Sequence, residues 1–255
     1  VSFVSSGGGG NPLANVTVRD STAFDFGAAL TLASGGNLIV TSGGNVTQGG
    51  GKLIIPGTTT ISAPSSTVTL SDPDNEFTGA VSIEAHTVDL EDKDAIVLGA
   101  STVTGNYLVT AAQAVTQLLD TALDITGTTT VSASGQNVTL ANTSNDFTGA
   151  VFITGAAVEL VDADTVVLGA STVTGTYAVT TKLGNITQIG DLNVTNASTF
   201  ETEAANGTIL CGNSLCTLPG GTNAFSGTVK LTTTGSSAHA YIDNGTTALQ
   251  IAAGT

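Results

Sequence analysis

The sequence has little of several residue types that common protein classes need. It contains no methionine and no tryptophan, and only 5 of its 255 residues are lysine or arginine, against 20 aspartates and glutamates. Charged residues make up 10% of the chain and aromatic residues 4%. A helical bundle or coiled coil needs many charged residues together with leucine and alanine, so the composition excludes that class.

The same scarcity excludes two further classes. Nucleic-acid binding depends on clustered lysine and arginine that displace counterions from phosphates, whereas the five basic residues are far apart in a chain of net charge −15. A membrane-spanning helix needs about 20 consecutive, mostly apolar residues, and the sequence has no such run. We therefore expect neither a nucleic-acid partner nor a transmembrane segment.

The residues that are abundant are typical of strands and turns. Valine, isoleucine and threonine pack well on a pleated surface, and the 32 glycines, together with asparagine, aspartate and serine, supply turns. Short runs such as 67–70 and 95–98 alternate between apolar and other residues, which is the signature of a strand. No stretch has a convincing helical period, so the sequence predicts an all-β protein.

An internal repeat with a period of about 70 residues is the main feature of the sequence. Segments 77–81 and 98–105 return unchanged as 147–151 and 168–175. In a third copy the spacing is longer, because an insertion lies between Phe147 and its counterpart, Phe225. We divide one elongated domain, 1–255, into four parts: a partial repeat at 1–44, repeats at 45–113 and 114–184, and a divergent repeat with a cysteine-containing insertion at 185–255.

Short strands at this density favour a parallel β-solenoid, in which stacked coils share one continuous core. With about 20–25 residues per coil, one repeat makes about three coils and the chain about eleven, in a rod about 50 Å long. Antiparallel sandwich domains are the alternative, but they need about 100 residues each. The positions predicted to face the core are Val68, Leu70, Val81, Ile83, Val88, Leu90, Ile96, Leu98, Val138, Leu140, Val151, Ile153, Val158, Leu160, Val166 and Leu168.

The repeated motifs resemble those of filamentous-haemagglutinin-like surface proteins, many of which are secreted by two-partner systems of Gram-negative bacteria. The resemblance rests on segments 137–140, 145–151 and 168–173, and it extends over roughly residues 28–200. It implies a right-handed parallel β-helix, exposure at the cell surface, and an adhesive or fibre-forming role.

Acidic pairs follow several predicted strands. The simplest interpretation is that they are turn residues that solvate the rod. Calcium binding is an alternative, because clustered carboxylates suit a hard cation; we expect no other cofactor. A glycosidase or lyase also uses paired carboxylates, but these pairs recur in adjacent copies, whereas a catalytic site is usually unique. The candidate calcium ligands are Asp72, Asp74, Asp92, Asp94, Asp162 and Asp164.

The two cysteines, Cys211 and Cys216, lie in the insertion. No second cysteine pair or histidine cluster accompanies them, so we favour a disulfide over a zinc site. A loop locked in this way on a rigid scaffold is a candidate for recognition of a partner.

The sequence predicts a structural or adhesive protein, secreted or at the cell surface, and not an enzyme. Unpaired edges at the ends of a solenoid invite pairing with another chain. Val1, Ser2, Phe3 and Val4 form a plausible strand for end-to-end association with further copies, or the chain is part of a longer parent protein. The alternative function is a polysaccharide-binding or polysaccharide-degrading β-helix, similar to a lyase or a phage tailspike. Host or cell-surface glycans are candidate partners in either case.

Overall fold

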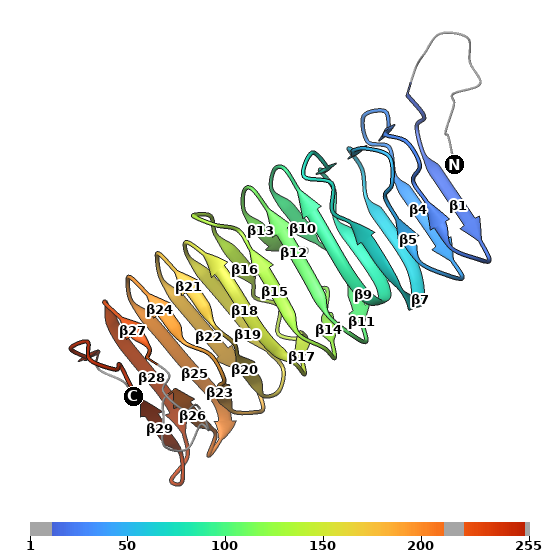
Figure 1. The fold of residues 1–255 in the computed structure, drawn as a ribbon. Helices are drawn as coiled ribbons and strands as arrows, with labels where there is room; N and C mark the ends of the chain where they lie inside the picture. The colour runs from blue at the N-terminus through green and yellow to red at the C-terminus, as the bar shows by residue number, and fades with distance from the viewer. Residues whose placement is uncertain (1–11, 212–221, 253–255) are drawn as a thin grey trace.

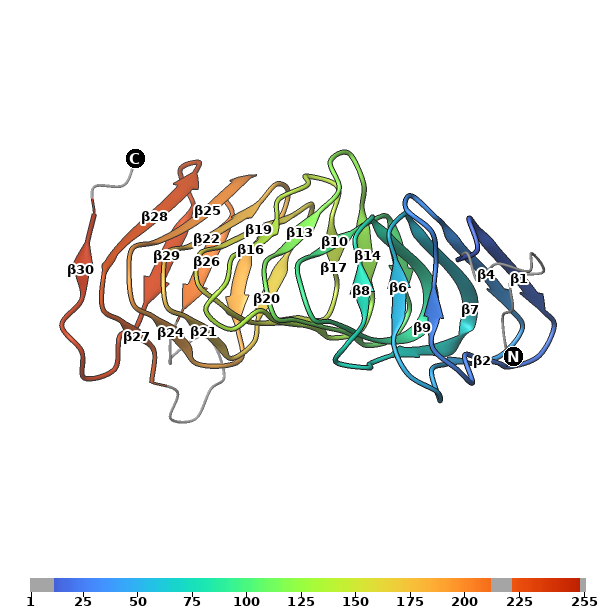
Figure 2. The same ribbon diagram turned by 90° about the horizontal axis from the view of Figure 1, so that it is seen from above.

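The computed structural model describes residues 12–211 and 222–252, and it is a parallel β-solenoid of about ten turns (Figure 1). The described residues form strands and connecting turns but no helix, so no helix in them is able to span a membrane. The strands run across the long axis of the molecule, and β1 and β30 lie at its opposite ends (Figure 2). The predicted all-β solenoid is confirmed.

Each turn but the last supplies one short strand to each of three faces, which we call A, B and C. Face A consists of β1 (Val16–Asp20), β4 (Leu38–Ser42), the first parts of β7 (Thr59–Leu70) and β9 (Val81–Asp92), β11 (Ser101–Val103), β14 (Leu123–Ile125), β17 (Asp146–Phe147), β20 (Val166–Leu168), β23 (Ile186–Gln188), β26 (Thr208–Cys211) and β29 (His239–Ile242). β7 and β9 each turn a corner and continue on face B, with a register shift at the corner between them.

The other two faces are built in the same way. Face B consists of β2 (Phe24–Asp25), β5 (Val46–Thr47), the second parts of β7 and β9, β12 (Tyr107–Ala111), β15 (Thr129–Ser132), β18 (Ala150–Gly155), β21 (Ser171–Val173), β24 (Leu192–Val194) and β27 (Ala224–Phe225). Face C consists of β3 (Leu30–Thr31), β6 (Leu53–Ile55), β8 (Glu76–Phe77), β10 (Ile96–Leu98), β13 (Val115–Gln117), β16 (Val138–Leu140), β19 (Val158–Asp162), β22 (Tyr177–Thr181), β25 (Ser198–Ala205), β28 (Thr228–Thr234) and β30 (Gln250–Ile251).

The core lies inside the three faces and runs along the axis. Strands on consecutive turns pair in parallel, so that buried residues stack on buried residues, as Val68, Val88 and Tyr107 do on face B. All sixteen positions that the sequence pattern assigned to the core are at most 2% exposed. The alternation of strand residues therefore predicted the inward face correctly.

The sequence repeat does not close on a whole number of turns. Phe77, Phe147 and Phe225 hold the same place in successive repeats, but they lie on β8 of face C, β17 of face A and β27 of face B. One repeat thus supplies ten strand positions, when β7 and β9 are counted on both of their faces. This refines the expected three coils per repeat to three turns and one third, and each repeat is rotated by one face relative to the last.

Glycines occupy one corner of consecutive turns because the backbones approach closely there. A Cβ atom added to Gly149 would lie 2.1 Å from the carbonyl oxygen of Gly127 on the turn below, and one added to Gly127 would lie 2.4 Å from the same atom of Gly105. Any side chain at this corner would therefore push two turns apart.

We predict that Gly149→Ala destabilises the protein by about 1–3 kcal/mol, because the added methyl group meets rigid backbone. Ser144→Ala, at an exposed turn position nearby in the sequence, is the matched control. Denaturant unfolding measures both variants. Equal stability of the two would show that the turns separate at this corner without cost.

Candidate functional site

A largely buried pair of amide side chains recurs at one corner of every repeat. In the second repeat, Gln117 Nε2 donates to Asn145 Oδ1 at 2.6 Å, and Asn145 Nδ2 donates back to Gln117 Oε1 at 2.9 Å. The same Asn145 oxygen accepts the N–H of Leu123 at 3.0 Å, and its amide nitrogen donates to the carbonyl of Leu140 at 3.3 Å. Asn145 is fully buried, so it pairs backbone groups that have no water available.

The first and third repeats have the same arrangement. Gln48 and Asn75 exchange two hydrogen bonds of 2.7 and 3.0 Å. Gln188 and Asn223 do the same, although the insertion lengthens their separation in the sequence to 35 residues. The sequence patterns described above did not predict these pairs. The available signal was a glutamine at or directly after the end of a strand and an asparagine two residues before a phenylalanine, both once per repeat.

Two aspartates predicted to solvate the surface are instead buried, which corrects that interpretation for them. Asp92 and Asp162 are 2% and 0% exposed. Asp92 Oδ2 accepts the N–H of Phe77 at 2.6 Å, and Asp162 Oδ2 accepts the N–H of Phe147 at 2.9 Å. The physical reason is that, within the described part of the chain, β8 and β17 have a partner strand on only one side, so a carboxylate oxygen takes the place of the missing strand.

In the third repeat an asparagine performs this role. Asn244 Oδ1 accepts the N–H of Phe225 at 2.6 Å, and Asn244 Nδ2 donates to the carbonyl of the same residue at 3.1 Å. This neutral version shows that the position needs an acceptor oxygen and does not need a charge.

Burial raises the pKa of the Asp162 carboxyl to about 6. Hydrogen bonds from the N–H groups of Phe147 and Asp164 oppose the increase, and the negative charges of Asp146 and Asp164 add to it. Burial likewise raises the pKa of Asp92. Each carboxylate therefore performs a structural role at an electrostatic cost near neutral pH.

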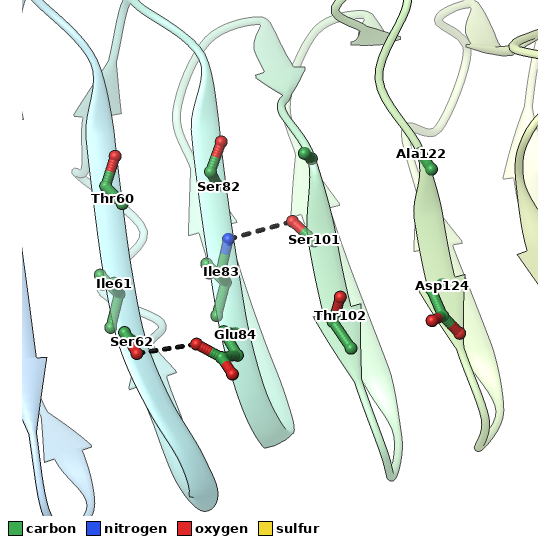
Figure 3. A pocket seen from close by; sticks show the side chains of 11 residues that line it. Thr60, Ile61, Ser62, Ser82, Ile83, Glu84, Ser101, Thr102, Ala122 and Asp124 are labelled. Carbon is green, nitrogen blue, oxygen red and sulfur yellow. Dashed lines mark hydrogen bonds between the residues drawn. The ribbon is translucent and has the colours of Figure 1, made fainter.

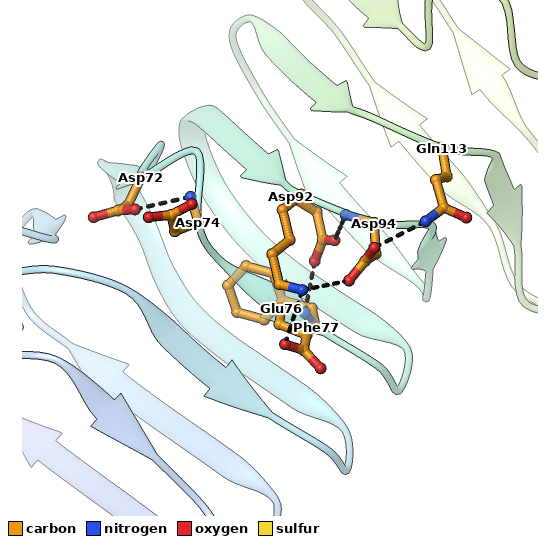
Figure 4. A network of polar contacts seen from close by, with 8 residues as sticks. Asp72, Asp74, Glu76, Phe77, Asp92, Asp94 and Gln113 are labelled. Atoms are coloured by element: carbon orange, nitrogen blue, oxygen red, sulfur yellow. Dashed lines mark hydrogen bonds and ion pairs between the residues drawn. The ribbon is translucent and has the colours of Figure 1, made fainter.

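The surface around the two buried aspartates differs between repeats. In the first repeat, Lys93 Nζ lies 3.2 Å from Glu76 and 2.8 Å from Asp94 (Figure 4). Asp94 also accepts a hydrogen bond of 2.8 Å from Gln113. In the second repeat Asp146 and Asp164 hold the places of the two acids, but Ala163 replaces the lysine. The second cluster therefore lacks the ammonium group that compensates the first.

The candidate calcium residues form short turns. In each pair the first aspartate accepts the backbone N–H of the second, at 2.9, 2.7 and 2.7 Å: Asp72 with Asp74, Asp92 with Asp94, and Asp162 with Asp164. Among residues 12–211 and 222–252, no three histidine, cysteine, aspartate or glutamate side chains gather in a way that could hold a metal ion. Calcium binding stays a prediction, and melting with and without a chelator measures it.

A surface hollow of about 420 Å³ lies on face A of the first repeat (Figure 3). It extends over β7, β9, β11 and β14, beside an irregular step where the chain leaves β10 and enters β11. There the N–H of Ile83 donates to the side-chain oxygen of Ser101 at 3.0 Å. The outward side chains that line the hollow are Thr60, Ser62, Ser82, Glu84, Thr102 and Asp124.

Several predicted site residues lie outside the part of the chain that the structure describes. Cys216 and the proposed self-association residues, Val1 to Val4, are among them. Cys211 is described only as the last backbone position of β26. The disulfide and the pairing strand therefore stay predictions.

A family model described as repeats of unknown function (DUF5649) matches residues 13–84, 85–154 and 155–232. The chain belongs to this family. Searches of curated proteins and of solved structures gave no match. The three DUF5649 repeats have the period found in the sequence but begin at a different phase, and each contains one of the amide pairs.

We predict that Asp162→Asn flattens the dependence of stability on pH. The folded pKa of about 6 lies above that of an unfolded aspartate. Because the folded state favours the neutral carboxyl of Asp162, the contribution of this group to the unfolding free energy is largest below about pH 4. This contribution is lost as pH rises through about 6. Between these limits the unfolding free energy of the wild type should fall by roughly 2–3 kcal/mol relative to the variant.

Denaturant unfolding at a series of pH values measures the unfolding free energy of the wild type and the variant. The test compares how steeply this free energy changes with pH in the two proteins. Its absolute value is not compared, because the variant also loses the hydrogen bond from the N–H of Asp164. Glu159→Gln, at an exposed position on the same strand, β19, is the control and should keep the slope of the wild type. Parallel curves for the wild type and Asp162→Asn would contradict the assignment.

A second prediction concerns the missing ammonium group. We expect Ala163→Lys to raise the melting temperature at low salt, because it restores the arrangement of Lys93 between two acids, and Lys93→Ala to lower it. High salt should shrink both effects, since exposed charges are screened. A melting temperature that is lower in Ala163→Lys than in the wild type would argue against a shared geometry of the two clusters.

Proposed function

We propose that the chain is a rigid structural rod, secreted or at the cell surface, with an adhesive or fibre-forming role. The observation that carries this proposal is the uninterrupted stack from β1 to β30, in which the described turns share one hydrophobic core. Bending such a rod would break hydrogen bonds and core contacts between turns, so it is suited to hold distant points apart. The resemblance of the repeats to filamentous-haemagglutinin-like proteins supports the surface location.

We propose a non-catalytic role for the acidic groups. Asp92 and Asp162 use their carboxylate oxygens to accept backbone hydrogen bonds in two successive repeats. This repetition is typical of a structural task, and Asn244 performs it without an ionisable group.

We also propose association through the ends of the solenoid, either with a second copy or with further repeats of a longer parent chain. Val1 to Val4 is the candidate pairing strand. The last described turn supports an interface, because Tyr241 and Ile251 are 49% and 57% exposed. Further, the outer edges of β29 and β30 have no partner strand among the described residues, and such edges pair readily.

Electron microscopy of the purified chain, combined with light scattering over a range of concentrations, tests the proposal. We expect straight rods that lengthen as concentration rises, and shorter particles when residues 1–4 are deleted. Globular beads on a flexible string would contradict the rigid rod. A particle that stays monomeric at high concentration would contradict end-to-end association alone.

The second candidate function is polysaccharide binding or degradation on the same scaffold. The hollow on face A favours it, because Glu84 and Asp124 lie there beside several hydroxyl groups. Screening of a glycan array and an assay for released reducing ends measure it. Binding that survives a filled hollow, for instance in Ser82→Phe, would place any glycan site elsewhere.

A further inference from the structure

The hollow lies on face A of the first repeat, and its counterpart on face B of the second repeat has a phenylalanine in place of a serine. Ser82 on β9 and Phe152 on β18 hold equivalent positions in the two repeats. A Cβ atom added to Gly169 would lie 2.5 Å from the Phe152 ring, so that ring lies across this glycine. Gly99 is the equivalent glycine in the first repeat, where the atom nearest to an added Cβ is the much smaller Ser82 hydroxyl, at 2.2 Å.

The surroundings of the two copies are otherwise built alike. The N–H of Ile153 donates to the side-chain oxygen of Ser171 at 3.1 Å, just as Ile83 donates to Ser101 at 3.0 Å. The same irregular step is therefore present in both repeats. In the second repeat the Phe152 ring lies beside this step, over Gly169.

The first copy also carries charge that the second copy lacks. Glu84 and Asp124 line the hollow of the first repeat, whereas Thr154 and Asn193 hold their places in the second. The two acids lie in one row with Thr102 between them on the intervening turn, so their backbone positions are about 10 Å apart. Their negative charges favour a cationic partner on either side of the depression.

We propose that this hollow binds an aromatic side chain flanked by lysine or arginine on a segment of another protein. The ring would lie over Gly99 as the Phe152 ring lies over Gly169, and the basic groups would meet Glu84 and Asp124. No aromatic side chain of residues 12–211 or 222–252 lines the hollow, so a sugar ring would lack a stacking surface. The proposal goes beyond the structural rod and does not depend on it.

A different protein is the better occupant than a second copy of this chain. The five basic residues of the chain are Arg19, Lys52, Lys93, Lys182 and Lys230. None of them lies within two positions of a phenylalanine or tyrosine in the sequence. The chain therefore contains no segment with the required combination.

Titration of a lysine-phenylalanine-lysine peptide, blocked at both ends, into isotope-labelled protein tests the proposal by nuclear magnetic resonance. We expect saturable shifts of backbone amides on β7, β9, β11 and β14. Replacing the central phenylalanine by alanine, or both lysines by glutamate, should weaken binding about tenfold or more.

Two variants of the protein locate the site. Ser82→Phe should abolish the shifts while leaving the melting temperature close to the wild type, since Phe152 occupies the equivalent position without disrupting the fold. The double variant Glu84→Thr with Asp124→Asn copies the charges of the second repeat and should weaken binding about tenfold. It keeps the test decisive if Ser82→Phe fails to fold.

A gain of binding is the converse test. Phe152→Ser combined with Thr154→Glu and Asn193→Asp should create a second site, and the number of bound peptides should rise from one to two. The proposal is overturned if the peptide causes no saturable shifts or if the two variants at the first site bind it as the wild type does. It is also overturned if chitotriose, and not the peptide, gives shifts that Ser82→Phe removes, because the hollow would then be a glycan site.

Discussion

The constraint on which this structure depends is that every turn must give its backbone polar groups partners on the turns before and after it. Where strands on consecutive turns are in register, their backbone N–H and carbonyl groups form hydrogen bonds with one another. At corners, side chains do so: the Asn106 oxygen accepts the N–H of Thr128 at 3.1 Å, and the Asn45 oxygen accepts that of Thr67 at 3.0 Å. An unpartnered buried N–H or carbonyl is costly, so the polar residues of this solenoid are as much a part of its stability as its apolar core.

The uneven length of the turns explains the unusual polar groups. Thr59 pairs with Val81 on the next turn of the solenoid, and Val81 pairs with Leu98 on the turn after that. The stretch of chain from Val81 to Leu98 is shorter than the one from Thr59 to Val81. At the shortened turn no strand covers β8, and the buried carboxylate of Asp92 substitutes for one. The irregular step from β10 to β11 lies on this shortened turn, beside the hollow on face A. One local change in the path of the chain therefore adjoins both the buried acid and the surface depression.

The sequence predicted what depends on local alternation and on repetition. Val68 and Leu70 face the core because strand residues alternate, and Phe77 and Phe147 correspond because the repeat is close to exact in that segment. It did not predict contacts that depend on how turns are aligned. Asp92 meets Phe77 across 15 residues, and Gln117 meets Asn145 across 28. These partners follow from the lengths of particular turns, which short motifs do not specify. The hollow combines residues from four turns, so its shape is visible only in the folded chain.

The rotation of each repeat by one face sets how the chain presents itself to its surroundings. Groups that recur once per repeat in the sequence therefore lie on three different faces of the rod in successive repeats. A flat surface that touches one side would therefore meet a given group once in every three repeats, and a duplicated repeat would not double the contacts on that side. Equivalent positions such as Ser82 and Phe152 lie on different faces of the rod, so each of them contacts different surroundings.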